Sequence, residues 1–305
     1  MHVVSAEEAG ERLDRILAAH HADRSRATYQ RWIAEGRVEL DGAIASASAR
    51  PRAGQQIRVR PAPPPPSDAE PEAIPLAVLY QDDDLVVIDK PAGMVVHPAP
   101  GHAGGTLVNA LLHHFGALPG EDAARPGIVH RLDAHTSGVM VVARTAAARE
   151  GLMAAFATHA IERSYLAIAV GHPPDAITYE TLHGRHPHDR KRFTTKVTRG
   201  KRALTRVEVL ERLHGAALVR CTLETGRTHQ IRVHLAEHGA PLLGDPVYGK
   251  RSKDPRVRAA ADALGRQALH AAVLGFAHPI TSAPLRFETP PPDDFRRALE
   301  ALRMP

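Results

Sequence analysis

One acidic side chain stands out in HRLDAHTSG, residues 130–138, where Asp133 follows Arg131 and precedes a small polar turn. Gly138 permits a tight turn, and the Thr136 and Ser137 hydroxyls can hydrogen-bond the loop that aims the carboxylate. The stretch contains no second acid, metal-binding spacing or phosphate loop. Hydrolysis of a glycosidic bond normally needs a second carboxylate to activate water. This stretch supplies no such second carboxylate beside Asp133.

The composition indicates one large and one small globular domain with an anionic partner. The chain has 305 residues, is 43% hydrophobic and carries a formal net charge of +5 with a pI near 9.6, which favours partners such as nucleic acid. No stretch approaches the roughly 18 apolar residues of a membrane span, and the N-terminus has no apolar signal region. We therefore expect a cytoplasmic protein with no membrane partner. Cys221, in the alternating run ALVRCTLET, predicts a buried strand thiol.

The first 60 residues predict a small α/β domain. Helices are expected over residues 11–21 and 26–36, the second capped by Ser25 and ended by Gly36. A strand over 37–40 precedes Asp41-Gly42, which is a hairpin signal. PAPPPPSDAEPEAIP, residues 61–75, predicts a semi-rigid linker before a second domain over 76–305.

The second domain is predicted to be α+β, with a mixed, largely antiparallel β-sheet flanked by helices. Strand-like runs cover 84–90, 138–144, 164–171, 203–213 and 217–225. Helical patterns cover 106–116, 145–159 with Thr145 as N-cap, 229–239 and 292–303. Because the strands outnumber the helices and do not alternate strictly with them, a doubly wound parallel sheet is disfavoured.

Positive charge is concentrated in residues 184–206, GRHPHDRKRFTTKVTRGKRALTR. Nine Arg or Lys residues and one acid, Asp189, give this segment a formal charge of +8, more than the whole chain carries. A solvated basic loop is one interpretation. The other is neutralisation of RNA phosphates, with Arg190, Lys191 and Arg192 as candidate contacts.

The N-terminal pattern resembles the S4 RNA-binding module. RLDRIL, DRSRATYQRWIAEGRVELDG and RAGQQIRV follow the order of the module, with Asp-Gly in place of its usual Asn-Gly. The resemblance implies a surface along the second helix and its exit that faces the phosphates of structured RNA. The candidate contacts are Arg24, Arg26, Arg31 and Arg37.

Five ordered blocks of the larger part resemble the RluA/RluD family of pseudouridine synthases. They are VVIDKPAGMVVHP (86–98), GIVHRLDAHTSGVMVVAR (127–144), RSYLAIAVG (163–171), LETGRTHQIRVHLAEHGAPLLGDPVYG (223–249) and RQALHAAVLGFAHPITSAPLRFETPPPDDF (266–295). The S4 module and the basic segment resemble the RluD branch, which acts on large-subunit ribosomal RNA. Ala134-His135 departs from the family, which usually has a basic and then an acidic residue there.

The resemblance implies that uridine is converted to pseudouridine without a cofactor or metal. Asp133 would attack or stabilise the sugar, or alternatively abstract a ribose proton, and Arg232 would favour its charged form. Tyr165 would pack on the uracil and could take the C5 proton, and Arg131 would hold open the space left by the flipped base. Without the resemblance, Arg232 suits a helix surface, Tyr165 a strand core and Arg131 a loop anchor.

Three functional interpretations are open from the sequence. They are a synthase for ribosomal RNA or a ribosome precursor, a synthase for transfer RNA, and a non-catalytic RNA-binding protein of the same fold. The S4 module favours the first. The histidines of HGRHPHDR could suggest a metal, but the flanking arginines would repel a cation. We expect no metal and a monomer.

Overall fold

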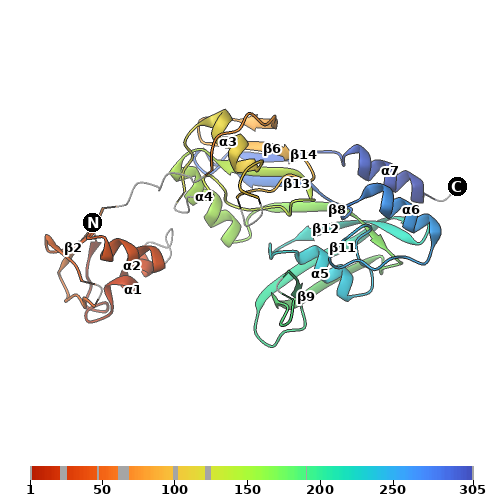
Figure 1. The fold of residues 1–305 in the computed structure, drawn as a ribbon. Helices are drawn as coiled ribbons and strands as arrows, with labels where there is room; N and C mark the ends of the chain where they lie inside the picture. Colours follow the sequence, from red (N-terminus) through yellow and green to blue (C-terminus); the bar gives the residue numbers. More distant parts are fainter. Residues whose placement is uncertain are drawn as a thin grey trace. The chain divides into compact units, whose positions relative to one another are not determined.

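The computed structural model describes residues 2–20, 26–46, 48–60, 69–98, 102–120, 125–189 and 191–303. The chain forms two compact units, Met1–Pro65 and Pro66–Pro305 (Figure 1). Glu70 and Glu72, in the part of the predicted linker that the structure describes, hydrogen-bond within the second unit. The Glu72 backbone N–H donates to the Asn109 carbonyl at 3.0 Å, and the Asn109 amide donates to the Glu70 carbonyl at 2.7 Å. Residues 61–68 lie outside the described part of the chain.

The first unit packs two helices on a four-stranded antiparallel sheet of order β1-β4-β2-β3. Its elements are β1 (His2–Val3), α1 (Leu13–His20), α2 (Arg26–Ala34), β2 (Val38–Leu40), β3 (Ala43–Ile44) and β4 (Gln56–Val59). Leu17, Trp32 and Ile57 lie in the core between helices and sheet. Asp41 and Gly42 have φ of 51° and 83° between β2 and β3, which confirms the predicted two-residue hairpin turn.

The second unit contains one ten-stranded sheet, with strand order β10-β9-β11-β12-β8-β13-β7-β6-β5 and β14 paired to β13. The strands are β5 (Ala77–Gln81), β6 (Leu85–Lys90), β7 (Ser137–Ala143), β8 (Glu162–Val170), β9 (Ala176–Arg185), β10 (Phe193–Thr194), β11 (Lys201–Leu213), β12 (Ala216–Leu223), β13 (Leu269–Ala277) and β14 (Pro284–Glu288). Only the pairing of β13 with β7 is parallel among those described. This confirms the predicted mixed, largely antiparallel sheet.

The helices of the second unit lie along both faces and at one end of the sheet (Figure 1). They are α3 (Leu107–Phe115), α4 (Ala146–Ala157), α5 (Gln230–Glu237), α6 (Pro255–Leu264) and α7 (Asp293–Leu302). Thr145 accepts from the Ala148 backbone N–H at 3.2 Å, which confirms the predicted N-cap of α4. The sequence did not predict β5, β9, β10, β13, β14 or α6. Within the described residues, no helix has both the length and the apolar character to cross a membrane.

The centre of the large sheet brings the Asp133 loop beside Tyr165. Gly138 at the start of β7 pairs with Ala271 of β13, and Ala271 pairs with Tyr165 of β8. The strands approach closely here, since a Cβ on Gly138 would lie 2.2 Å from the Ala271 carbonyl oxygen. With φ of 117° as well, this position requires glycine. The loop before β7 therefore opens directly onto β8.

Candidate active site

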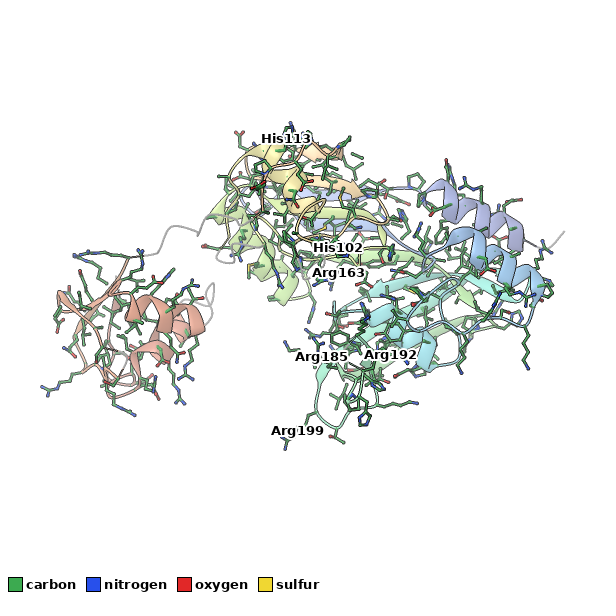
Figure 2. The ribbon with its side chains drawn as sticks, viewed as in Figure 1. His102, His113, Arg163, Arg185, Arg192 and Arg199 are labelled. Carbon is green, nitrogen blue, oxygen red and sulfur yellow. The ribbon has the colours of Figure 1, made fainter. Side chains whose placement is uncertain are left out.

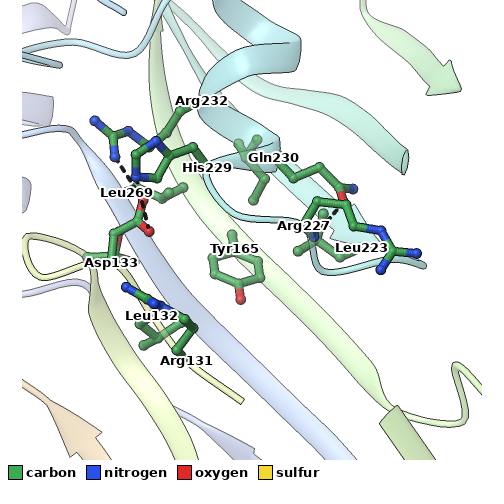
Figure 3. A pocket seen from close by; sticks show the side chains of 12 residues that line it. Arg131, Leu132, Asp133, Tyr165, Leu223, Arg227, His229, Gln230, Arg232 and Leu269 are labelled. Atoms are coloured by element: carbon green, nitrogen blue, oxygen red, sulfur yellow. Dashed lines mark hydrogen bonds and ion pairs between the residues drawn. The ribbon is translucent and has the colours of Figure 1, made fainter. Parts of the chain in front are cut away.

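A buried arginine joins two aspartates in the second unit. Nη1 of Arg232 donates to Oδ2 of Asp133 at 2.9 Å, and Nε and Nη2 donate to the two carboxylate oxygens of Asp245 at 2.8 and 2.9 Å. The side chain of Asp245 is fully buried, whereas that of Asp133 keeps 17% of its surface exposed. Asp245 therefore anchors the guanidinium, and Asp133 is the carboxylate that faces the pocket (Figure 3).

The pairing determines the charges of the buried groups. Burial opposes charge on Arg232, but its bonds to Asp245 and Asp133 raise the pKa of the guanidinium. Burial likewise opposes charge on Asp245, but the bonds from Arg232 and from backbone N–H groups lower the pKa of this carboxyl. The cationic Arg232 can thus stabilise a negative charge on Asp133. The fully buried Asp245 carboxylate balances the positive charge of the guanidinium.

Lys90 holds the loop that carries Asp133. It ends β6, is fully buried, and its Nζ donates to the carbonyl oxygens of Pro91, Met94 and Ala134 at 2.8, 2.9 and 3.1 Å. Burial lowers the pKa of Lys90 to about 7, a shift that the Asp133 carboxylate opposes. Ala134 contributes only its backbone carbonyl to this contact. The departure from the family at this position therefore leaves the contact intact.

The two hydroxyls after Asp133 have partners different from those predicted. Gln267 Nε2 donates to the Thr136 hydroxyl at 3.4 Å, and the Ser137 hydroxyl lies 3.0 Å from Nδ1 of His270. They therefore join the Asp133 loop to β13 and to the segment that leads into it. The turn is closed by the Thr136 backbone N–H, which donates to the Asp133 carbonyl at 3.0 Å.

Tyr165 lies between Asp133 and the loop that precedes α5 (Figure 3). The pocket combines charged side chains with apolar ones from β12, the start of α5 and β13, namely Leu223, Ile231 and Leu269. Burial raises the pKa of Tyr165 to about 12; nearby Arg163 opposes the shift and Asp133 adds to it. The phenol is therefore protonated near neutral pH. A half-buried aromatic ring with apolar neighbours, in a pocket that also carries charged groups, suits a planar base.

Arg131 is exposed at the edge of the pocket. A second cleft shares Arg131, Tyr165 and Arg227 with the pocket and also contains Arg163. Arg163 is 7% exposed and donates to the Glu224 carbonyl at 2.6 Å. The cleft beside the pocket is therefore rich in guanidinium groups, which are donors for a phosphate backbone.

Comparisons with known proteins identify the family of this chain. Residues 84–237 match the family model of RNA pseudouridylate synthases, and residues 11–57 match that of the S4 domain. The chain is 42% identical to the ribosomal large subunit pseudouridine synthase D of Xanthomonas campestris, covering 99% of this chain and 92% of that protein. The chain belongs to the RNA pseudouridylate synthase family.

Further relatives of this RNA pseudouridylate synthase support the same assignment. It is 44% identical to the Bacillus subtilis protein named uncharacterized RNA pseudouridine synthase YlyB, covering 98% of this chain and 96% of that protein. The structure of human RNA pseudouridylate synthase domain containing 1 matches with a TM-score of 0.57 and 25% identity, covering 77% of this chain and 98% of that chain. The predicted family, S4 domain and enzymatic activity on RNA are confirmed.

The basic segment of the synthase, residues 184–206, includes the antiparallel pairing of β9 with β10 and is termed the basic hairpin. This basic hairpin contains the end of β9, all of β10 and the first part of β11. Lys191, Lys196 and Arg199 are exposed, and Figure 2 shows Arg199 at the outer end. Arg202 and Arg206, in contrast, form ion pairs with Glu224 at 2.5 and 3.5 Å. Part of the charge is therefore neutralised within the protein.

Arg192 differs from its exposed neighbour Lys191. It is half-buried, and its guanidinium carbon lies 5.3 Å from the centroid of the Tyr248 ring. Arg232 lies 5.2 Å from the same centroid. Arg192 thus links the basic hairpin to the active site. Arg190, the third predicted contact of this segment, lies outside the described residues.

Three of the four arginines predicted to face RNA in the first unit have carboxylate partners. Nε of Arg26 donates to the buried Asp14 at 2.7 Å. Arg31 and Arg37 both approach Glu35, at 3.8 and 2.8 Å. Arg24 lies outside the described residues. A phosphate would compete with these carboxylates, so the RNA-facing role of this set stays a prediction.

Four residues of the site were missed by reasoning from the sequence: Lys90, His229, Asp245 and Tyr248. They lie in DKPAGM, RTHQIR and GDPVYG, which are parts of the ordered blocks. The order of the blocks does not by itself give these side chains a role. The blocks could have marked them as candidates. Their partners, however, are set by contacts between distant segments, such as the pairing of Arg232 with Asp245.

Proposed function

We propose that this synthase converts uridine to pseudouridine in large-subunit ribosomal RNA, with Asp133 acting on the ribose. The observation that carries the proposal is the accessible Asp133 carboxylate, held at 2.9 Å by the buried Arg232 beside Tyr165. An anionic group beside an aromatic ring and the apolar side chains of Leu223, Ile231 and Leu269 suits attack on a sugar whose base lies against that ring.

The reaction leaves the atomic composition of the RNA unchanged. The C1′–N1 bond breaks and its electron pair leaves with the uracil, the uracil turns, and C5 forms the new bond to C1′. C5 then gives up its proton, which passes to water, and N1 takes up a proton from water. Asp133 either bonds to C1′ as N1 leaves and is displaced when C5 attacks C1′, or removes the ribose C2′ proton and returns it when the bond from C5 to C1′ forms. In both routes the cation of Arg232 stabilises the reactive carboxylate.

For Tyr165 we propose packing against the uracil. With the pKa raised to about 12, removing its proton near pH 7 would cost about 7 kcal/mol, at roughly 1.4 kcal/mol for each of about five pKa units. A protonated phenol is a poor acceptor for the C5 proton. Its ring supplies a flat surface at low entropic cost instead.

Arg131 is proposed to occupy the place of the flipped base. Its side chain is exposed at the edge of the pocket, where it can reach a base stack once the target uridine has turned out. The remaining arginines of the adjoining cleft would contact the backbone of the flanking nucleotides.

Large-subunit ribosomal RNA is proposed as the target on the names of the relatives and on the S4 domain. The relatives from Xanthomonas campestris and Nitrosomonas europaea, at 42% and 44% identity, are named ribosomal large subunit pseudouridine synthase D. We further propose that the enzyme acts as a monomer in the cytoplasm without a membrane partner. Deletion of the gene followed by chemical mapping of pseudouridine should remove signals from large-subunit RNA. Loss from transfer RNA alone would contradict the proposed target.

The role of Asp133 is tested by Asp133→Asn. The amide keeps the size of the carboxylate but lacks its charge, so tritium release from C5-labelled uridine should fall by several orders of magnitude, each tenfold step being about 1.4 kcal/mol of barrier. RNA affinity in a filter-binding titration should stay near wild type. Asp175→Asn, at a side chain that is 90% exposed, is the matched control. Turnover retained in Asp133→Asn would refute the proposal.

A further inference from the structure

His229 occupies a strained position at the N-terminal end of α5. It has φ of 59° and ψ of 19°, in the left-handed region that favours glycine, and its side chain makes no capping hydrogen bond to the helix. A residue with a Cβ is strained in this conformation and keeps it only when the surrounding structure holds it there. The helix itself gains no cap from this histidine. The conformation does, however, place the imidazole in the active-site pocket (Figure 3).

The hydrogen bonds of Tyr248 fix which nitrogen of His229 carries the proton. Oη of Tyr248 accepts from the Phe193 backbone N–H at 2.8 Å and lies 2.9 Å from Nδ1 of His229. Nδ1 is the acceptor within reach of the phenol proton among the described residues. With Nδ1 accepting this bond, a neutral imidazole carries its proton on Nε2.

The other nitrogen of His229 faces the second oxygen of the reactive carboxylate. Nε2 lies 3.7 Å from Oδ1 of Asp133, while Arg232 bonds to Oδ2. Burial lowers the pKa of His229, although Asp133 opposes the shift, so the ring is neutral near pH 7. The opposite tautomer would direct a lone pair at the carboxylate. Electrostatics and the Tyr248 bond thus favour the same tautomer, in which Nε2–H faces Asp133.

We propose that His229 is a positioning residue for Asp133, with Nε2–H donating to Oδ1 and Tyr248 maintaining the required tautomer. The inference rests on the proposed role of Asp133. The distance of 3.7 Å between Nε2 and Oδ1 is longer than a hydrogen bond. A movement of the Asp133 loop toward His229 by less than 1 Å would bring the two atoms within hydrogen-bonding distance. With Arg232 on one oxygen and His229 on the other, the carboxylate keeps a single orientation toward the ribose.

Tyr248 also connects this arrangement to the basic hairpin. Its ring contacts the guanidinium groups of Arg192 and Arg232, and its hydroxyl accepts from Phe193 on β10. A shift of β10 would therefore disturb the hydrogen bond between Tyr248 and His229 that fixes the tautomer of His229. RNA bound to the basic hairpin would act on the same tyrosine.

The tautomer is tested without any activity assay. In the full-length protein labelled with ¹⁵N-histidine, the signals that disappear in His229→Gln identify the ring nitrogens of His229. We expect a neutral ring protonated on Nε2 in the wild type, and a mixture of tautomers in Tyr248→Phe, which keeps the ring but removes the hydroxyl. A wild-type His229 protonated on Nδ1, or a tautomer unchanged in Tyr248→Phe, would overturn the proposal.

The positioning role is tested by separating turnover from binding. His229→Phe should lower kcat by roughly 10- to 100-fold with KM and RNA affinity within about twofold of wild type, because the missing bond acts on the carboxylate and not on RNA. His229→Gln, whose side-chain amide can place an N–H near Oδ1, should restore most of the turnover. Tyr248→Phe should lower kcat with the same split.

His238→Gln provides the matched control, since His238 lies at the other end of α5 and is exposed. We expect wild-type kcat for this variant. Unchanged kcat in His229→Phe would reject the positioning role, while the Asp133→Asn result separately decides the proposed function. If His229→Phe does not fold, the tautomer measurement on the wild type and the kcat of Tyr248→Phe decide the question.

Discussion

Replacing Asp245 tests the anchor beneath the active site. Its carboxylate accepts two bonds from Arg232 at 2.8 and 2.9 Å and two from backbone N–H groups of Val247 and Tyr248 at 2.9 and 3.0 Å. In Asp245→Asn one oxygen can still serve the backbone groups. The new amide, however, directs N–H bonds toward a guanidinium that also donates, and the compensating charge is removed.

The expected loss of stability follows from burial. Removing one partner of a buried ion pair typically costs about 3–5 kcal/mol. For a unit of this size each kcal/mol lowers Tm by roughly 2–4 °C, so Asp245→Asn should lower Tm by about 6–20 °C. Turnover should fall at least about tenfold, because Arg232 is no longer held in the orientation that meets Asp133.

The assay pairs thermal unfolding with tritium release from folded protein. The control is Glu162→Gln, whose partner Arg286 lies 3.1 Å away and whose side chain is 48% exposed. An exposed pair contributes about 0–1 kcal/mol, so its Tm should shift by less than about 4 °C. An Asp245→Asn variant with wild-type Tm would refute the buried-anchor reasoning. A lowered Tm with wild-type turnover would refute the link from Asp245 to Asp133.

Two further predictions concern pH and salt. Burial lowers the pKa of His234 from 6.5 to about 4. The neutral His234 therefore contributes stability above pH 6.5, and this contribution declines by up to about 3 kcal/mol as the pH falls toward 4. In urea titrations at pH 7.5 and 4.5, His234→Gln should lose less stability between the two pH values than wild type, and an equal loss would contradict this. Replacing exposed Lys191, Lys196 and Arg199 with alanine should lower the slope of log affinity against log salt by up to about 0.7–0.9 for each RNA phosphate that is no longer neutralised. The control Arg286→Ala should leave this slope unchanged. An unaltered slope in the triple variant would favour the interpretation of residues 184–206 as a solvated basic segment.

Local chemistry made several features of the fold predictable. Thr145 can cap α4, and Asp41-Gly42 can adopt positive φ, because both effects involve only a few neighbouring residues. Strands whose residues alternate between apolar and polar, or are mostly β-branched, were predicted for the same reason, because these patterns are also local. In contrast, eight of the nine residues of β13 are buried, and such a continuous apolar run cannot be told from a buried helix by periodicity.

The ordered blocks allowed Asp133, Tyr165 and Arg232 to be selected as candidates, but only the tertiary structure brings them together. Asp133 and Arg232 are 99 residues apart in the chain, and their meeting depends on the pairing of β7, β13 and β8.

The sequence by itself determined the family pattern, the residue types of the site and the concentration of positive charge. The tertiary structure decided how those charges are used. It shows Arg232 anchored by Asp245, Arg192 turned onto Tyr248, and His229 facing Asp133. The physical reason is that the state of an ionisable group depends on its burial and its nearest charges, and both are set by segments that are distant in the chain.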